Sequence, residues 1–293
     1  MRKARQLAIL GMVVSGLLAL IKIAAGWKAH SASVLADGFE SAADVFASGL
    51  VLVGLIIAAR PADRDHPYGH GRVETLTGLV LGFFLFAAGV LIAWHGITGA
   101  ADAVVPEAWA IIPLVISIFA KAWLVALKYR HGKSIGSSSL IADAANDAID
   151  ILSGAVALIA LSLTVWKPGS FLKADHYGAF FVGVIVIATA VRIILDASLH
   201  LMDTMPSDEM MSSIRAAART VAGVKGVEKC FARKTGLKYH VDLHLEVDPE
   251  ISVRASHDIA QKVRARIKDE LPWVADVLVH VEPFPGESCE TLQ

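Results

Sequence analysis

Residues 34–59 read VLADGFESAADVFASGLVLVGLIIAA, and this stretch decides the fold class. It is long enough to cross the hydrocarbon core of a bilayer, which takes about 20 predominantly apolar residues in an α-helix. It also carries Asp37, Glu40 and Asp44, spaced i, i+3 and i+7, so the three carboxylates share one helical face. One charged side chain at the centre of a membrane helix costs about 2.5 to 3.5 kcal/mol on insertion scales. Three of them together require a compensating role.

The rest of the chain has the composition of a membrane protein with a polar tail. Of its 293 residues, 55% are hydrophobic and 19% are charged, and the mean hydropathy is +0.57. Six apolar runs reach spanning length, at residues 7–26, 34–59, 73–97, 108–127, 140–165 and 178–201. We therefore expect an α-helical membrane bundle of six transmembrane helices over residues 1–203 and a soluble domain over residues 204–293.

Basic residues are concentrated in alternate loops. They precede the first span and lie between spans 2 and 3 and between spans 4 and 5, while the opposite loops are poorer in Lys and Arg. The positive-inside rule then places both termini in the cytoplasm. The first run has full spanning length and no convincing cleavage site, so we expect it to stay in the protein. This pattern predicts an integral protein of the lipid bilayer, placed in a bacterial inner membrane.

The tail predicts a small α+β domain. Ser207 is expected to cap a helix that runs to about residue 221 and is ended by Gly223 and Gly226. Residues 227–233, 239–247 and 277–281 read as strands, with a helix over 253–271. The order α-β-β-α-β indicates an open ferredoxin-like, or metallochaperone-like, sheet with its helices on one face. Cys230 and Cys289 offer no disulfide framework.

A second acidic face lies in the fifth span, where Asp143, Asn146, Asp147 and Asp150 share one side of the helix. Two facing helices that each offer an i, i+4 oxygen pair can assemble a four-ligand site for a divalent cation. We assign this site to Glu40 with Asp44, and Asn146 with Asp150. Capping of helix ends or hydrogen bonding across the bundle is the alternative for Asp37 and Asp143, and the role of Asp147 stays open.

Two histidine clusters outside the spans also predict metal sites. The loop 63–74 reads DRDHPYGHGRVE and brings Asp63, His66 and His70 together, although a solvated turn explains the same residues. In the tail, the candidates are His240 and His244 on one strand, His257 on the helix, and His280 with Glu282 on the last strand. Histidines that serve only the surface or the core are the alternative there.

Three motifs in order resemble the cation diffusion facilitator family: HSASVLAD at 30–37 continuing to Glu40 and Asp44, HPYGHGRVE at 66–74, and ADAANDAID at 142–150. The resemblance implies a homodimeric, proton-coupled exporter of zinc or related divalent ions, with a metal-sensing cytoplasmic domain. It implies transport ligands at Glu40, Asp44, Asn146 and Asp150 and a loop site at Asp63, His66 and His70. It also implies a tail site at His244, His257, His280 and Glu282, with Glu228 as a further candidate. Arg72 and Asp203 resemble a charge interlock at the dimer interface.

Zinc is the favoured ion, as transported substrate and as regulatory ligand. An all-oxygen set of Glu, Asp, Asn and Asp lacks imidazole, however, and suits manganese or iron(II) comparably, with cobalt and cadmium as further candidates. The sequence contains no HExxH, GxSxG or Walker A motif, so we expect neither an enzyme nor a nucleotide-driven pump. No basic tract indicates nucleic acid. A passive metal channel or a metal sensor is the remaining alternative.

Overall fold

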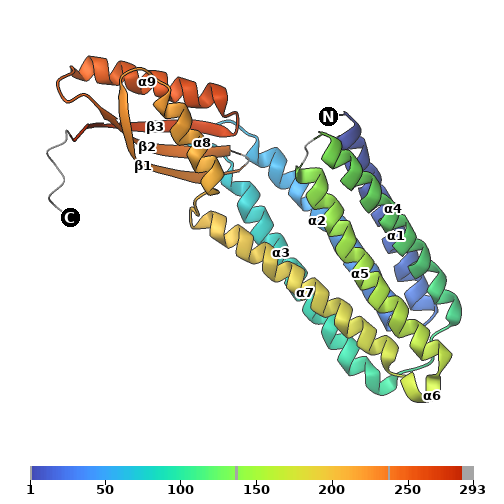
Figure 1. The fold of residues 1–293 in the computed structure, drawn as a ribbon. Coiled ribbons are helices and arrows are strands. Elements are labelled where there is room, and N and C mark those ends of the chain that lie inside the picture. Colours follow the sequence, from blue (N-terminus) through green and yellow to red (C-terminus); the bar gives the residue numbers. More distant parts are fainter. Residues whose placement is uncertain (1, 136–137, 237, 286–293) are drawn as a thin grey trace. The chain divides into compact units, whose positions relative to one another are not determined.

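The six apolar runs fold as long helices in the computed structural model, which describes residues 2–135, 138–236 and 238–285. The long helices are α1 (Arg2–Lys28), α2 (Ala32–Ala58), α3 (Arg72–Thr98), α4 (Ile111–Ile135), α5 (Ser138–Trp166) and α7 (Ala174–Leu201). Short turns of helix, η1 (Gly99–Asp102), η2 (Ala108–Ala110) and α6 (Pro168–Phe171), complete this part (Figure 1). Within the described residues, six helices are long and apolar enough to cross a membrane, which confirms the predicted number of spans.

The chain divides into two compact units. One consists of Met1–Val53 and Gly78–Ile194, and the other of Gly54–Thr77 and Leu195–Gln293. The first unit therefore holds most of the helical bundle. The second holds the ends of α2, α3 and α7 with the loop between α2 and α3, together with the tail domain. Cys289 lies outside the described residues.

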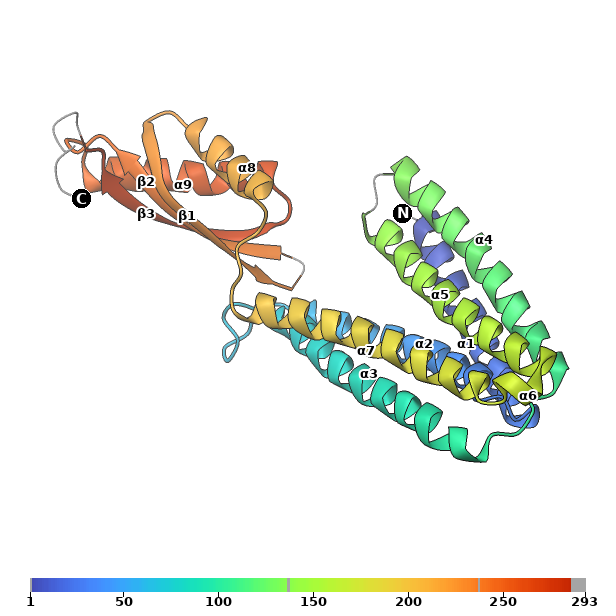
Figure 2. The same ribbon diagram turned by 60° about the horizontal axis from the view of Figure 1, so that its bottom comes forward.

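Small side chains let the membrane helices pack closely. The buried core of the first unit is rich in alanine, with Ala25 of α1 and Ala29 just after it beside Ala157 of α5 and Ala179 of α7. Helices α3 and α7 run side by side (Figure 2), and at Gly183 an added Cβ would lie 2.6 Å from the backbone nitrogen of Ala93. Small residues at such contacts are the usual means of close packing between helices in lipid.

Asp175 fixes the beginning of α2. Its Oδ2 accepts a hydrogen bond from the backbone N–H of Ala32 at 2.5 Å, and its Oδ1 accepts one from the hydroxyl of Ser31 at 2.8 Å. The hydroxyl of Ser33 donates to the same Oδ1 at 2.5 Å. A carboxylate at this place satisfies free N–H groups of the first helical turn. The serines that precede the acidic face of α2 therefore join the helix to α7.

The tail forms the predicted α-β-β-α-β domain. Its elements are α8 (Asp208–Arg219), β1 (Val224–Thr235), β2 (Lys238–Val247), α9 (Val253–Glu270) and β3 (Val274–Pro283). In the described part of the tail the strand order is β1-β2-β3, with β1 antiparallel and β3 parallel to β2. Ser207 is the N-cap residue of α8, as predicted, although its side chain makes no capping hydrogen bond, whereas Ser252 caps α9 by accepting from the N–H of Ala255 at 3.2 Å. One local expectation was wrong, because Gly226 lies inside β1 and does not end the helix.

One face of this sheet is covered by helices. Val241, Leu243 and Leu245 alternate along β2 and are buried against Ile214 of α8 and Val263 of α9. Because neighbouring residues of a strand point to opposite faces, the even-numbered residues of β2 lie on the other face. That second face carries the histidines.

Candidate metal centres

The four residues assigned to the transport site line one small cavity of the helical bundle. The cavity measures about 20 Å³, which is room for a single water-sized particle. It is bounded by α2, α3, α5 and α7, and its lining residues are Glu40, Ala43, Asp44, Leu85, Asn146, Ile149, Asp150, Val186 and Thr189. The facing pairs on α2 and α5 therefore meet as the helical spacing predicts.

Glu40 offers this cavity an unused oxygen. Its carboxylate is buried, with only 6% of the residue exposed, and Oε1 accepts a hydrogen bond from the Ser153 hydroxyl at 2.9 Å. Oε2 is also buried and has no hydrogen-bond partner in the described structure. A buried carboxylate oxygen without a partner is unfavourable unless a cation or a proton completes it.

Buried lysines accompany the acids of α5. Lys121 of α4 lies 2.5 Å from Asp150 Oδ2 and 2.7 Å from Asp147 Oδ1. Lys128, two turns along the same helix, lies 2.5 Å from Asp147 Oδ2 and 2.9 Å from Asp143. Lys128, Asp147, Lys121 and Asp150 thus form a ladder of alternating charge that ends at the cavity. Asp147 belongs to this ladder and does not line the cavity.

A separate buried pair joins α1 to α2. Lys22 lies 2.8 Å from Asp37 and donates a hydrogen bond to the Ser41 hydroxyl at 2.7 Å. Asp37 and Asp143 therefore have structural partners, as the alternative explanation predicted for them. From the sequence we assigned no partner to Lys22 or Lys121, and Lys128, expected among the basic residues of the loop between spans 4 and 5, instead lies buried within α4. The available signal was a lysine within an apolar run, because a charge inside a span requires a partner.

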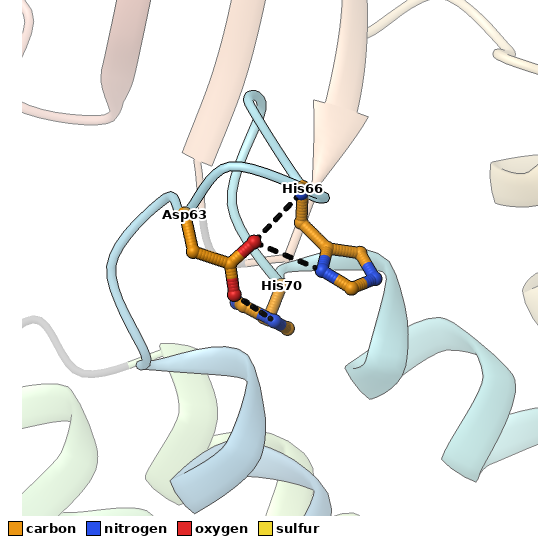
Figure 3. Close-up of side chains that lie close together, drawn as sticks. All are labelled: Asp63, His66 and His70. Carbon is orange, nitrogen blue, oxygen red and sulfur yellow. Dashed lines mark hydrogen bonds and ion pairs between the residues drawn. The ribbon is translucent and has the colours of Figure 1, made fainter.

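The loop between α2 and α3 brings its three candidate ligands together. Asp63 Oδ1 lies 3.1 Å from His66 Nδ1, and Asp63 Oδ2 lies 3.4 Å from His70 Nε2 (Figure 3). The three side chains offer ligand atoms within 4.8 Å of one another. Gly69, at φ +80, allows the tight turn that folds His70 back toward Asp63.

The same turn keeps Asp63 ionised. The backbone N–H of His66 donates to its carboxylate at 2.7 Å, and the N–H of Asp65 donates at 3.0 Å. The hydrogen bond from the His66 backbone is the main cause that lowers the pKa of Asp63 below its ordinary value, and the His66 ring adds to it. A carboxylate must be deprotonated to bind a metal, so this geometry favours a cation.

Arg72 and Asp203 form the ion pair that the family resemblance implied. The guanidinium nitrogen Nη2 of Arg72 lies 3.1 Å from Asp203 Oδ1 and 3.4 Å from Oδ2. Both side chains are about half exposed. An exposed pair of this kind contributes little to stability by itself.

The tail cluster lies on the sheet face that carries no helix. His244 Nδ1 is 2.6 Å from Glu282 Oε1, and His280 Nε2 is 3.6 Å from the same oxygen. These three residues offer ligand atoms within 4.8 Å of one another. Side-chain hydrogen bonding with Glu228, and then with His244, lowers the pKa of Glu282, so Glu228 lies beside the cluster.

Two other tail candidates lie apart from this cluster. His257 is exposed on α9, on the opposite side of the sheet, where its ring is 3.4 Å from the Gln261 side chain. His240 shares a face with His244, but four residues of strand separate them by roughly 13 Å. Its ring instead contacts Tyr68 edge to face, with centroids 5.9 Å apart, and burial lowers its pKa. The structure therefore brings neither His240 nor His257 to the cluster of His244, His280 and Glu282.

This arrangement gives a direct prediction for the tail site. In the full-length protein, His244→Ala is expected to lower the number of Zn²⁺ ions bound per chain by one, because it removes a central ligand. The matched variant His257→Ala is expected to leave that number unchanged. Equilibrium dialysis with Zn²⁺ measures both. Loss of one ion in His257→Ala would show that this histidine belongs to the site.

Comparisons with known proteins agree with these features. A model of the cation efflux transmembrane domain matches residues 8–202, and a model of the cation efflux protein cytoplasmic domain matches residues 206–284. The manganese efflux system protein MneP of Bacillus subtilis is 29% identical over 96% of this chain and 96% of its own length. An uncharacterised transporter of Methanocaldococcus jannaschii is 33% identical over 96% of this chain and 99% of its own length. Metal tolerance protein C1 of Arabidopsis thaliana is 30% identical, and the chain spans 63% of its length.

Proposed function

Because this chain belongs to the cation efflux family, we propose that it is a proton-coupled antiporter that exports divalent metal cations from the cytoplasm as a homodimer. The observation that carries the proposal is the cavity where Glu40, Asp44, Asn146 and Asp150 meet. Carboxylates at this depth of a membrane bundle are typical of ion pathways. The unpartnered Glu40 oxygen supports the assignment, because a bound cation would satisfy it.

We propose manganese as the preferred ion, with iron(II) next, although the family resemblance favoured zinc. All four ligands are oxygen donors, and oxygen-only sets suit harder cations such as Mn²⁺ better than zinc. Among the relatives, MneP and MneS of Bacillus subtilis are both named manganese efflux proteins. Asn146 contributes a neutral oxygen where an imidazole would favour zinc.

Proton coupling follows from the chemistry of the ligands. A carboxylate binds a metal only when it is ionised, so protons and metal ions compete for Glu40, Asp44 and Asp150. Exposure of the cavity to each side of the membrane in turn would convert that competition into exchange. The loop and tail clusters would then bind cytoplasmic metal as regulatory sites.

Proteoliposomes test this function. Mn²⁺ added to one side of vesicles that contain the protein is expected to drive proton movement in the opposite direction, and an imposed pH gradient is expected to accelerate Mn²⁺ flux. Zn²⁺, Fe²⁺, Co²⁺ and Cd²⁺ tested in parallel rank the ions. Metal flux that ignores the pH gradient would indicate a passive channel, and no metal flux at all would indicate a sensor.

A further inference from the structure

Lys121 is a buried charged residue beside the cavity, and it has no role in the transport reaction proposed above. Its ammonium is only 3% exposed, and it lies 2.5 Å from Asp150, one of the four cavity ligands. While the ammonium of Lys121 is paired with Asp150, Lys121 is not itself a metal ligand. An incoming cation and Lys121 therefore compete for the Asp150 carboxylate, of which the lysine holds Oδ2.

The balance of buried charges in the bundle indicates the effect of this competition between Lys121 and a cation. In the described bundle, Lys121 and Lys128 balance Asp147 and Asp150, which are all buried. Lys22 likewise balances Asp37. Of the acids that line the cavity, Glu40 and Asp44 remain, and no lysine or arginine of the described residues lies within ion-pair distance of either. The other buried acid of the bundle, Asp175, is held by hydrogen bonds at the beginning of α2. The two negative charges of Glu40 and Asp44 equal the charge of one divalent cation.

Lys121 also has a second carboxylate ready to accept it. Asp147 Oδ1 is 2.7 Å from its ammonium, while Lys128 holds the other oxygen of Asp147 at 2.5 Å. Asp147 precedes Asp150 by three residues, so the two carboxylates lie on one face of α5. Lys121 can therefore lose its hydrogen bond to Asp150 and still keep the one to Asp147.

We propose, building on the proposed function, that Lys121 is an internal counter-ion of the transport site that exchanges with the metal. It pairs with both Asp150 and Asp147 when the site is empty, and it gives up Asp150 and keeps Asp147 when a divalent cation binds. This exchange weakens metal binding and makes release easier. Lys121 is thus a positioning residue that acts through Asp150, and it tunes affinity for a divalent cation.

The test compares equilibrium binding with transport in full-length protein. Lys121→Met is expected to tighten Mn²⁺ binding, measured by calorimetry, by at least tenfold, equivalent to about 1.4 kcal/mol. The same variant is expected to lower the maximal Mn²⁺ flux in proteoliposomes by about tenfold, because release becomes slow. Lys121→Arg keeps the charge and is expected to restore both quantities to within a few-fold of the unmodified chain.

A matched control separates this role from simple stabilisation. Lys22→Met removes another paired lysine of the bundle, whose partners Asp37 and Ser41 do not line the cavity, and it is expected to leave Mn²⁺ affinity unchanged. If Lys121→Met does not fold, Lys121→Gln carries the same comparison, since its amide still donates a hydrogen bond.

Unchanged or weaker Mn²⁺ binding in a folded Lys121 variant would overturn the inference. It would show that the lysine only stabilises the bundle. Absence of Mn²⁺ binding and flux in the unmodified chain would instead refute the proposed function. The two failures are therefore distinguishable.

Discussion

Glu40→Gln is expected to reduce Mn²⁺ flux in proteoliposomes by at least about 100-fold, because it replaces a charged direct ligand by a neutral amide, whereas loss of an outer-shell partner alone costs about 10 to 100-fold. The amide keeps the size of the side chain, and its oxygen can still accept the hydrogen bond from Ser153. The change therefore removes charge with little effect on packing. It also removes one of the two negative charges that no lysine balances.

The control for this prediction is a second acid of the membrane helices. Asp196 of α7 is exposed, lies 3.8 Å from His200 and does not line the cavity. Asp196→Asn is expected to leave flux within about twofold of the unmodified chain, as for other surface changes. Similar flux in Glu40→Gln and the unmodified protein would remove Glu40 from the transport site.

The membrane part of the fold follows closely from the sequence. The length of an apolar run is a strong constraint, because every backbone polar group in lipid must be paired within a helix. The helical repeat then places Glu40 with Asp44, and Asn146 with Asp150, on one face of each helix. These local rules are sufficient to predict the residues that line the cavity.

The lysines that pair with the buried aspartates could not be predicted in the same way. Lys22 is on α1 and Lys121 is on α4, and only the packing of whole helices decides which carboxylate each one meets. The separation between Lys121 and Asp150 in the sequence gives no periodic signal. The residues that form the charge ladder can therefore be identified only from the folded structure.

The grouping of the histidines in the tail domain was also only partly predictable from the sequence. Strand alternation places His280 with Glu282, and His240 with His244, on one face of each strand. It is the pairing of β2 with β3 that brings His244 beside His280 and Glu282 and leaves His240 apart. The position of His257 depends instead on which face α9 covers. Val263 and Ile267 bury α9 against the face opposite to His244, so His257 lies on the far side of the sheet.

The buried pair between α1 and α2 has a different role from the ladder, since it lies away from the cavity. Lys22 and Asp37 are each 1% exposed, and Lys22 also holds the Ser41 hydroxyl. It joins α1 to the helix that carries Glu40 and Asp44. The pair therefore stabilises the packing of α1 against α2 without contributing a residue to the cavity.

Lys22→Met is expected to destabilise the protein by about 3 to 5 kcal/mol, because it leaves the Asp37 carboxylate buried without its partner. Thermal unfolding of the detergent-solubilised protein measures this effect, and the melting temperature is expected to fall by roughly 10 °C. Metal affinity per folded molecule is expected to be unchanged, since neither residue lines the cavity.

Two further variants decide whether the lost charge pair is the cause. Lys28→Met makes the same substitution at an exposed position of α1 and is expected to change stability by no more than about 0.5 kcal/mol. The double variant Lys22→Met/Asp37→Leu replaces the pair by apolar side chains and is expected to recover most of the lost stability. If the double variant is as unstable as Lys22→Met alone, the lysine stabilises the bundle through packing or through Ser41, and the ion pair is not the source of the effect.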